Sequence, residues 1–131
     1  MTPYRTLLAD DVFDLRFMVR LALERSGKFE IVGEAENGQE AIDLARAHKP
    51  DLVLLDISMP VMDGLEALPK VLDACGRCKV VMLSGFEASR LGATALELGA
   101  AGYLEKGVAP RQLITELEKV MTSPSDERSA S

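Results

Sequence analysis

The sequence lacks long apolar runs, and its basic residues are outnumbered by acidic ones. No apolar run in the 131 residues is long enough to span a bilayer, and the segment Met1–Arg5 lacks the apolar core of a signal peptide. The 21 acidic and 15 basic residues give a formal net charge of -6, which disfavours nucleic acid or an anionic membrane as a partner of the isolated chain. We therefore expect a cytoplasmic protein that binds neither directly.

Cysteine and histidine are also scarce. The two cysteines, Cys75 and Cys78, lie where a helix is predicted to end and a strand to begin, whereas redox-active pairs of the thioredoxin type open a helix. We therefore expect two ordinary reduced thiols. The single histidine, His48, is predicted at a helix end, where it is a surface or capping residue.

The overall composition of the chain is that of a globular domain. With 47% hydrophobic and 27% charged residues, the chain fits one domain that buries a full core. Strand and helix patterns alternate about five times, which is typical of a parallel sheet covered on both faces. Strands are predicted at 4–9, 29–35, 52–56, 79–83 and 102–105. We therefore expect an α/β fold with a doubly wound, five-stranded parallel sheet.

Helices are predicted after each strand, including 64–75, 89–98 and a last helix that begins at Pro110. Gly92 weakens the fourth of these helices. The last helix ends before Ser123, where a polar segment begins. We expect one domain over residues 1–122 and a disordered polar tail over 123–131.

The helix after the first strand has apolar residues on two sides. At 100° per residue, the arc expected to face the core is formed by Leu15, Met18, Val19, Ala22 and Leu23. Phe13, Phe17 and Leu21 fall on the other side. Two interpretations stay open: either neighbouring loops or the last helix cover this stripe, or it is exposed and docks a partner.

Polar side chains end or follow four of the predicted strands: Asp10, Asp11, Asp56, Ser84 and Lys106. Because the carboxyl ends of parallel strands meet at one edge, we expect these groups to converge. Three crowded carboxylates cannot all stay ionised without a cation, and oxygen ligands with open positions suit Mg²⁺. A hydroxyl and an ammonium opposite them complete an oxyanion site. The set therefore favours phosphoryl transfer to a carboxylate nucleophile.

Each of these residues taken alone has a simpler interpretation. Asp10 and Asp11 are suited to capping a helix, and Asp56 to forming a turn. Ser84 is suited to a loop, and Lys106 to a solvated surface. Their joint placement at strand ends favours the site.

In order and spacing, these motifs resemble the receiver domain of two-component response regulators from Tyr4 to about Met121. The matching residues are Asp10-Asp11 as the acidic pair, Asp56 as the phosphoacceptor, Met59-Pro60 and Asp63-Gly64 as the following loop, Ser84 and Tyr103 as the switch residues, and Lys106 as the lysine. The resemblance implies a flavodoxin-like receiver fold with strand order 2-1-3-4-5. Taken alone, Tyr103 on a strand is an ordinary packing residue.

The resemblance also implies the roles of the site residues. Asp11, Asp56 and the main-chain carbonyl of Ser58 would bind Mg²⁺ directly, with Asp10 acting partly through water. Ser84, Lys106 and main-chain amides near Ser58 and Gly85 would hold the phosphoryl group. The phosphoryl donor would be a histidine kinase or a histidine phosphotransfer protein, and the domain would catalyse only its own phosphorylation and dephosphorylation.

Phosphorylation is expected to change an output face. Ser84 would move toward the phosphoryl group, and the Tyr103 ring would enter the space that Ser84 leaves. The changed face would contact a downstream effector or a second copy of the chain. Two residues depart from the family pattern: Gly85 stands where alanine usually follows the switch hydroxyl, and Gly107 where many receivers have proline. Both are expected to loosen the switch loops.

Two other classes of protein share parts of this pattern, and a further alternative keeps the receiver within a longer protein. A flavodoxin-like cofactor binder needs a first loop that cradles phosphate, which Asp10-Asp11 would repel. A hydrolase with an aspartyl-phosphate intermediate needs a second acid or base and a substrate cap, and neither is visible in the sequence. The chain also resembles receivers that precede a helix-turn-helix domain, so it is alternatively the receiver part of a DNA-binding regulator.

Overall fold

The computed structural model describes residues 2–85 and 91–123. Within these ranges the chain forms a five-stranded parallel sheet with helices between the strands. The elements are β1 (Tyr4–Ala9), α1 (Phe13–Ser26), β2 (Phe29–Ala35), α2 (Gly38–His48), β3 (Leu52–Asp56), α3 (Gly64–Cys75), β4 (Lys79–Ser84), α4 (Leu91–Glu97), β5 (Gly102–Glu105) and α5 (Pro110–Thr122). The strand order β2-β1-β3-β4-β5 confirms the predicted fold. None of the described helices is long and apolar enough to cross a membrane.

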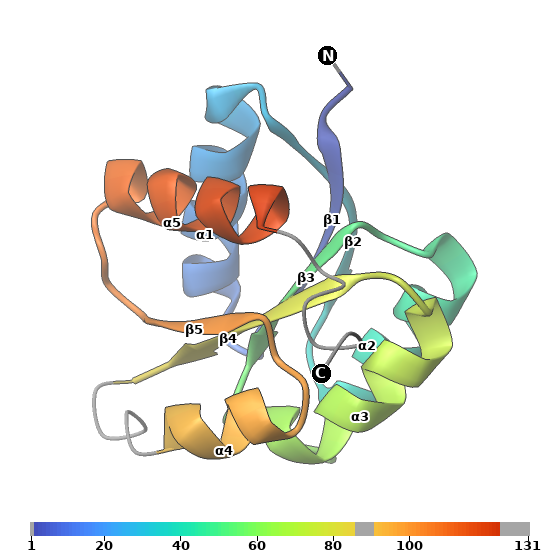
Figure 1. Cartoon of the computed structure of the whole chain (residues 1–131). Coiled ribbons are helices and arrows are strands. Elements are labelled where there is room, and N and C mark those ends of the chain that lie inside the picture. Colours follow the sequence, from blue (N-terminus) through green and yellow to red (C-terminus); the bar gives the residue numbers. More distant parts are fainter. Residues whose placement is uncertain (1, 86–90, 124–131) are drawn as a thin grey trace.

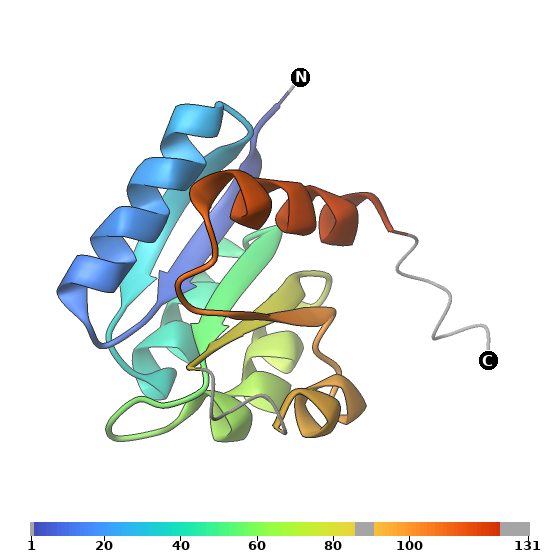
Figure 2. The same cartoon turned by 90° about the vertical axis from the view of Figure 1, so that its left-hand side faces the viewer.

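Helices cover both faces of the sheet. α1 and α5 lie on one face, and α2, α3 and α4 lie on the other (Figure 1 and Figure 2). All five residues of the central strand β3 are buried. Val53 and Leu55 belong to the core on the side of α2 and α3. Leu52 and Leu54 belong to the core on the side of α1 and α5. Burial on both faces explains why this strand reads as a continuous apolar run.

The observed element boundaries differ slightly from the predicted ones at the fourth strand and fourth helix. β4 includes Ser84, one residue beyond its predicted end, because Ser84 still pairs with Glu105 in β5. α4 ends at Glu97, one residue earlier than predicted. The first residues predicted for this helix, and the tail from residue 124, lie outside the described residues.

The orientation of α1 differs from the prediction at Met18. This residue was predicted to face the core, but its side chain is 64% exposed, so that prediction was wrong. Leu23 is fully buried as predicted, and Arg16 is also buried. The helix is turned so that Arg16 faces the sheet, where Glu34 of β2 pairs with it. An ion pair therefore takes an inward position that hydrophobic periodicity assigns to apolar residues.

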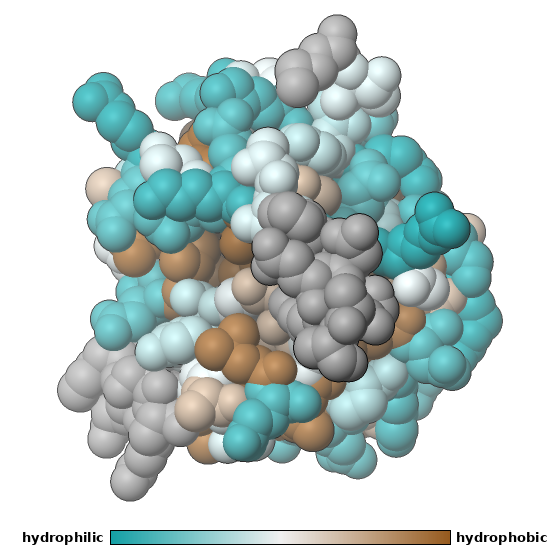
Figure 3. Space-filling model, viewed as in Figure 1, coloured by the Kyte–Doolittle hydropathy of each residue, from teal (hydrophilic) through white to brown (hydrophobic). Residues whose placement is uncertain are grey.

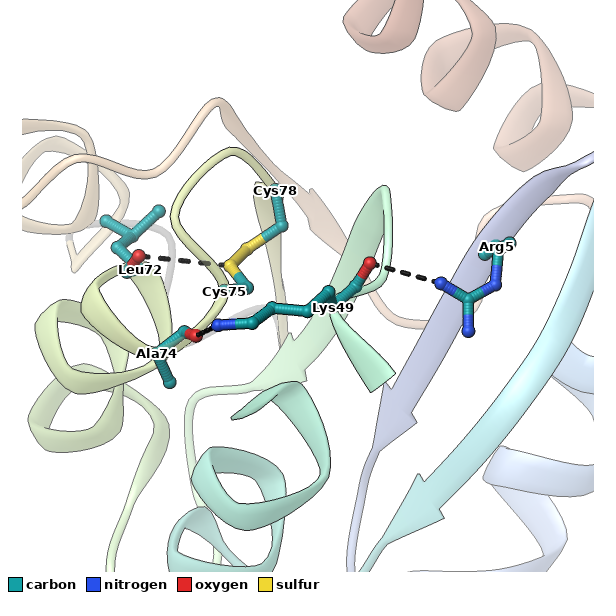
Figure 4. The surroundings of a disulfide bond; sticks show 6 residues. All are labelled: Arg5, Lys49, Leu72, Ala74, Cys75 and Cys78. Atoms are coloured by element: carbon teal, nitrogen blue, oxygen red, sulfur yellow. Dashed lines mark hydrogen bonds between the residues drawn. A yellow bond between two sulfur atoms is a disulfide. The ribbon is translucent and has the colours of Figure 1, made fainter. Parts of the chain in front are cut away.

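Cys75 and Cys78 form a disulfide bond between the end of α3 and the start of β4, so the expectation of two reduced thiols was wrong (Figure 4). Gly76 has a φ of 76°, which turns the chain at the end of α3 and brings the two Cα atoms within 5.7 Å. Lys49 lies beside this turn and donates from Nζ to Ala74 O at 2.7 Å. The disulfide therefore lies at the amino end of β4, away from the carboxyl ends of the strands.

Candidate functional site at the carboxyl edge of the sheet

The carboxyl ends of four strands carry the candidate site. Asp56 and Ser84 are the last residues of β3 and β4, while Asp10 and Lys106 directly follow β1 and β5. Main-chain hydrogen bonds continue along this edge, from Asp10 N to Ala35 O at 3.0 Å and from Lys106 N to Ser84 O at 2.7 Å. The sheet therefore fixes the backbone from which each of these side chains projects.

Three carboxylates meet at this edge. Asp10, Asp11 and Asp56 each offer an oxygen within 4.8 Å of the others. Asp10 and Asp56 are 4% and 2% exposed, whereas Asp11 is on the surface. Mg²⁺ prefers oxygen ligands, keeps several waters and is usually held by one or two carboxylates. This donor set, with one member open to solvent, fits the predicted metal.

Lys106 supplies the positive charge of the cluster. Its Nζ donates to Asp56 Oδ2 at 2.8 Å and lies 3.2 Å from Asp10 Oδ2. Burial lowers the pKa of this ammonium, but the hydrogen bond and charge of Asp56, together with Asp10, outweigh that effect and raise the pKa. Lys106 is therefore charged and bridges the two buried carboxylates.

Burial raises the pKa of Asp56 to about 6, and the charge of Asp10 adds to the effect. Hydrogen bonds from Lys106 and from the Ser58 amide, 3.2 Å from Asp56 Oδ1, act in the opposite direction. At neutral pH this carboxylate is ionised, yet it is more basic than an ordinary aspartate. Such a group is suited to act as a nucleophile.

Ser84 contributes a hydroxyl that has no partner among the described residues. The residue is 1% exposed, and its Oγ makes no hydrogen bond within this part of the chain. A buried polar group in that state costs roughly 1–3 kcal/mol. An oxygen acceptor bound beside Asp56, on the neighbouring strand, would satisfy it.

The loop after Asp56 folds back against the end of β3. Gly64 N donates to Ile57 O at 2.8 Å, and a Cβ at position 64 would overlap the carbonyl oxygen of Asp56. Residue 64 must therefore be glycine. Asp63 caps α3 by accepting from Glu66 N at 2.8 Å. The Asp63-Gly64 pair that predicted this loop thus also holds the main chain at Asp56.

The acidic pair does not cap α1. The N-cap residue is Val12, and no side chain makes a capping bond there. Asp10 Oδ1 instead accepts from Val12 N at 2.9 Å, and Asp10 Oδ2 faces Lys106. The simpler interpretation of these carboxylates as helix caps is therefore not supported.

Tyr103 lies on β5, where it pairs with Met82 of β4, and it is not part of the polar cluster. Its partly buried ring packs against α4 at Gly92, where a Cβ would overlap the ring. Gly92, which the sequence marks only as a weak point of a helix, therefore makes room for this aromatic side chain.

Two charged residues beside the site were not predicted. Arg16 donates from Nη1 to Asp10 O at 2.6 Å and from Nε to Glu34 Oε1 at 2.7 Å. The signal in the sequence was Arg16, which directly follows Leu15 of the arc expected to face the core. Its partner, Glu34, lies near the end of β2. Such a pair is ordinarily placed on the surface.

The parallel sheet and its edge, where an acidic cluster faces one lysine and a buried hydroxyl, define a class of α/β signalling domains. Residues 6–118 match the family model for the response regulator receiver domain. The chain therefore belongs to the response regulator receiver domain family. Members of this family act with histidine kinases and output domains.

Individual relatives agree with this assignment. The response regulator UvrY of Escherichia coli (strain K12) is 38% identical over 114 residues, which are 87% of this chain and 52% of that protein. The chain thus spans about half the length of UvrY. The signal receiver domain of the response regulator NarL from Mycobacterium tuberculosis has a TM-score of 0.86 at 31% identity, over 95% of this chain and 100% of that one.

A third similar structure comes from the CheX-CheY-BeF3-Mg²⁺ complex of Borrelia burgdorferi. One of its chains has a TM-score of 0.85 at 26% identity, over 92% of this chain and 91% of that one. The overall fold is therefore shared with a protein that was crystallised with BeF3 and magnesium.

Proposed function

We propose that this receiver accepts a phosphoryl group on Asp56 in the presence of Mg²⁺ and thereby switches its output face. The observation that carries the proposal is the buried Asp56 carboxylate, which lies in the acidic cluster and accepts a hydrogen bond from Lys106. A lysine in this position can neutralise a phosphoryl oxygen. The Borrelia complex, which contains BeF3 and Mg²⁺, supports the same chemistry in this chain.

In the proposed reaction, a carboxylate oxygen of Asp56 attacks the phosphorus of a phosphohistidine. The P–N bond breaks, and its electron pair returns to the imidazole nitrogen of the donor. Mg²⁺, when bound, neutralises charge on the phosphoryl oxygens. Asp11, Asp56 and the carbonyl of Ser58 would hold this ion directly, and Asp10 would do so partly through water. The domain acts only on itself, so it is not an enzyme with a separate substrate.

The switch would use Ser84 and Tyr103. The unpaired hydroxyl of Ser84 would donate to a phosphoryl oxygen, and the Tyr103 ring would leave Gly92 for the space that Ser84 vacates. Apolar surface lies over β5, between α4 and α5 (Figure 3). Leu96 and Leu98 are 47% and 41% exposed. We assign this face to a downstream effector or to a second copy of the chain.

The phosphoryl donor would be a histidine kinase or a histidine phosphotransfer protein that docks on the stripe of α1. This stripe consists of Phe13, Phe17 and Leu21, which are 63%, 51% and 36% exposed. The rings of Phe13 and Phe17 stack with centroids 6.2 Å apart. Because α1 begins two residues after Asp11, a helix seated on the stripe would lie beside the acidic cluster.

Intact-mass measurement after incubation with acetyl phosphate tests the phosphoacceptor. The wild-type protein is expected to gain the mass of one phosphoryl group when Mg²⁺ is present and none when EDTA removes it. Asp56→Asn should gain none under either condition. A label of unchanged size in Asp56→Asn would contradict the proposal.

A second candidate function is the receiver part of a helix-turn-helix transcription regulator. It is supported by the length of UvrY, of which this chain spans about half. We propose a receiver domain at 1–122, followed by a polar tail at 123–131, and a cytoplasmic location. Sequencing the gene beyond Ser131 tests the alternative: continued coding sequence with a helix-turn-helix pattern supports it, and a stop codon contradicts it.

A further inference from the structure

We propose that Arg16 is a positioning residue for the metal site: it holds the main chain of Asp10 so that the acidic cluster keeps the geometry that a divalent cation needs. The inference rests on the proposed function, because it concerns the Mg²⁺ which that function requires. Arg16 would act through Asp10 and not by touching the metal.

The carbonyl of Asp10 needs a donor from outside the sheet. The pairing of β1 ends at Ala9, opposite Ala35 of β2 and Leu55 of β3. One residue further on, Arg16 Nη1 donates to Asp10 O at 2.6 Å. Without this donor, a buried carbonyl would lose its hydrogen-bond partner, which is unfavourable. Because this carbonyl belongs to the peptide group between Asp10 and Asp11, the bond fixes the backbone of both carboxylates.

Arg16 is itself held in place. Its Nε donates to Glu34 Oε1 at 2.7 Å, and its side chain is only 9% exposed. Glu34 on β2 also accepts from Arg20, one turn further along α1. The guanidinium is planar, so two of its donors have a fixed relative direction. One donor binds Asp10 and another binds Glu34, which ties the end of β1 to both α1 and β2.

This restraint matters because Mg²⁺ demands a nearly regular octahedral geometry at short distances. Hydrogen bonds that orient metal ligands from outside contribute roughly 10–100-fold to metal affinity. The Asp10 carboxylate is held by Val12 N and Lys106. Its main chain is held by Ala35 on one side and by Arg16 on the other. Loss of Arg16 would release that second side.

Charge alone predicts the opposite result. Arg16 is a cation bonded beside an acidic cluster, so its removal should strengthen the attraction of the cluster for a divalent cation. The loss of positioning should weaken binding. Arg20 provides a matched control, because it lies on the same helix, has the same charge and also pairs with Glu34. Its side chain is 45% exposed, and its partners in the described part of the chain are Glu24 and Glu34.

The test measures Mn²⁺ binding to the full chain by EPR, without any phosphoryl donor. Arg16→Met is expected to raise the Kd about tenfold, and Arg20→Met should leave it within about twofold of wild type. Arg16→Lys should fall between these values, because one ammonium cannot hold both Asp10 and Glu34. Unchanged or tighter binding by Arg16→Met would overturn the inference, as would an equal loss in Arg20→Met.

If circular dichroism shows that Arg16→Met does not fold, a second pair of variants provides the test. Glu34→Gln removes the charge that orients Arg16, and Glu24→Gln removes an equal charge from the exposed side of α1. Weaker Mn²⁺ binding in Glu34→Gln than in Glu24→Gln supports positioning, and equal binding overturns it. If the wild-type protein binds no Mn²⁺, the proposed function fails as well. If the wild-type protein binds Mn²⁺ and Arg16→Met binds it equally well, the positioning role fails while the proposed function stands.

Discussion

At the level of single residues, Asp56 combines two opposed properties. It is 2% exposed at the end of a buried strand, yet the proposed chemistry needs it ionised. Burial raises its pKa to about 6, and the hydrogen bond from Lys106 keeps the pKa from rising further. A bound cation would favour the ionised form in the same way. The end of β3 therefore carries a buried negative charge on Asp56, which a bound metal ion would neutralise.

This arrangement predicts how stability depends on pH without metal. The folded pKa of Asp56, about 6, lies above the ordinary value of 3.8, so the folded state binds this proton more tightly than the unfolded chain does. Its contribution to the free energy of unfolding is therefore full below about pH 4 and is lost as the pH rises through about 6. Urea unfolding in EDTA at several pH values should show this loss in wild type and a smaller one in Asp56→Asn.

The same comparison supplies its own control. At about pH 8, where the wild-type carboxylate is ionised, metal-free Asp56→Asn should be more stable than wild type, because the neutral amide avoids burying a charge. Equal pH dependence in the two proteins would contradict burial as the cause of the shift.

The site residues differ in how far the sequence could predict them. Asp10, Asp56, Ser84 and Lys106 were predictable because each ends or follows a strand, and a parallel sheet brings such ends together. Their roles toward the metal and the phosphoryl group stay predictions. Arg16 was not predictable, because its contact with Asp10 depends on how α1 is turned against the sheet, which periodicity fixes only to within a residue.

At the level of elements, α4 packs closely against β5 where Gly92 meets the Tyr103 ring. The Tyr103 ring of β5 occupies the place where any larger residue at position 92 would put its Cβ. Glycine in a helix costs about 1 kcal/mol relative to alanine. The glycine that weakens α4 is therefore required by the Tyr103 ring of β5, and the sequence of the helix alone does not reveal this.

Gly92→Ala should therefore displace the Tyr103 ring while favouring the helix itself. If the ring is coupled to the switch, the NMR signals of Tyr103 and α4 in the unphosphorylated variant should shift toward those of wild type treated with beryllofluoride and Mg²⁺. If the signals of Tyr103 in Gly92→Ala stay in place, or move in a direction unrelated to the beryllofluoride-treated wild type, the coupling is absent.

Most element boundaries could be predicted from apolar runs and turn residues, but some features could not. Gly107 adopts a φ of 94°, a conformation closed to the proline that many receivers have at this position. Cys75 and Cys78 form a disulfide because the turn at Gly76 brings them together, whereas sequence position alone suggested free thiols. These features depend on backbone turns, and hydrophobic periodicity does not report them.

At the level of the whole molecule, two apolar surfaces lie on different helices around one polar edge. The stripe of α1 is proposed to receive the phosphoryl donor, and the face with α4 to transmit the change. Because each surface is proposed to serve a different step, a substitution on one surface should affect either donor docking or output, and not both. This separation can be tested with variants that leave the core intact.

Phe17→Ser combined with Leu21→Gln should slow phosphotransfer from a histidine kinase or a phosphotransfer protein. Phosphorylation by acetyl phosphate should not change, since that donor needs no docking surface. Leu96→Gln with Leu98→Gln is the matched control on the other face and should leave transfer intact. Because Phe17 and Leu21 are 51% and 36% exposed, stability should change little. A loss of several kcal/mol in urea unfolding would show instead that the stripe is buried.

The chemistry assigned to the carboxyl edge depends on which side chain receives the phosphoryl group. Borohydride reduces an acyl phosphate to an alcohol, so a phosphorylated aspartate becomes homoserine, which peptide mass spectrometry can locate. After treatment with acetyl phosphate, we expect homoserine at Asp56 alone, and only when Mg²⁺ is present. Homoserine at Asp10 or Asp11, or a stable phosphate on Ser58 or Ser84, would contradict the proposed site.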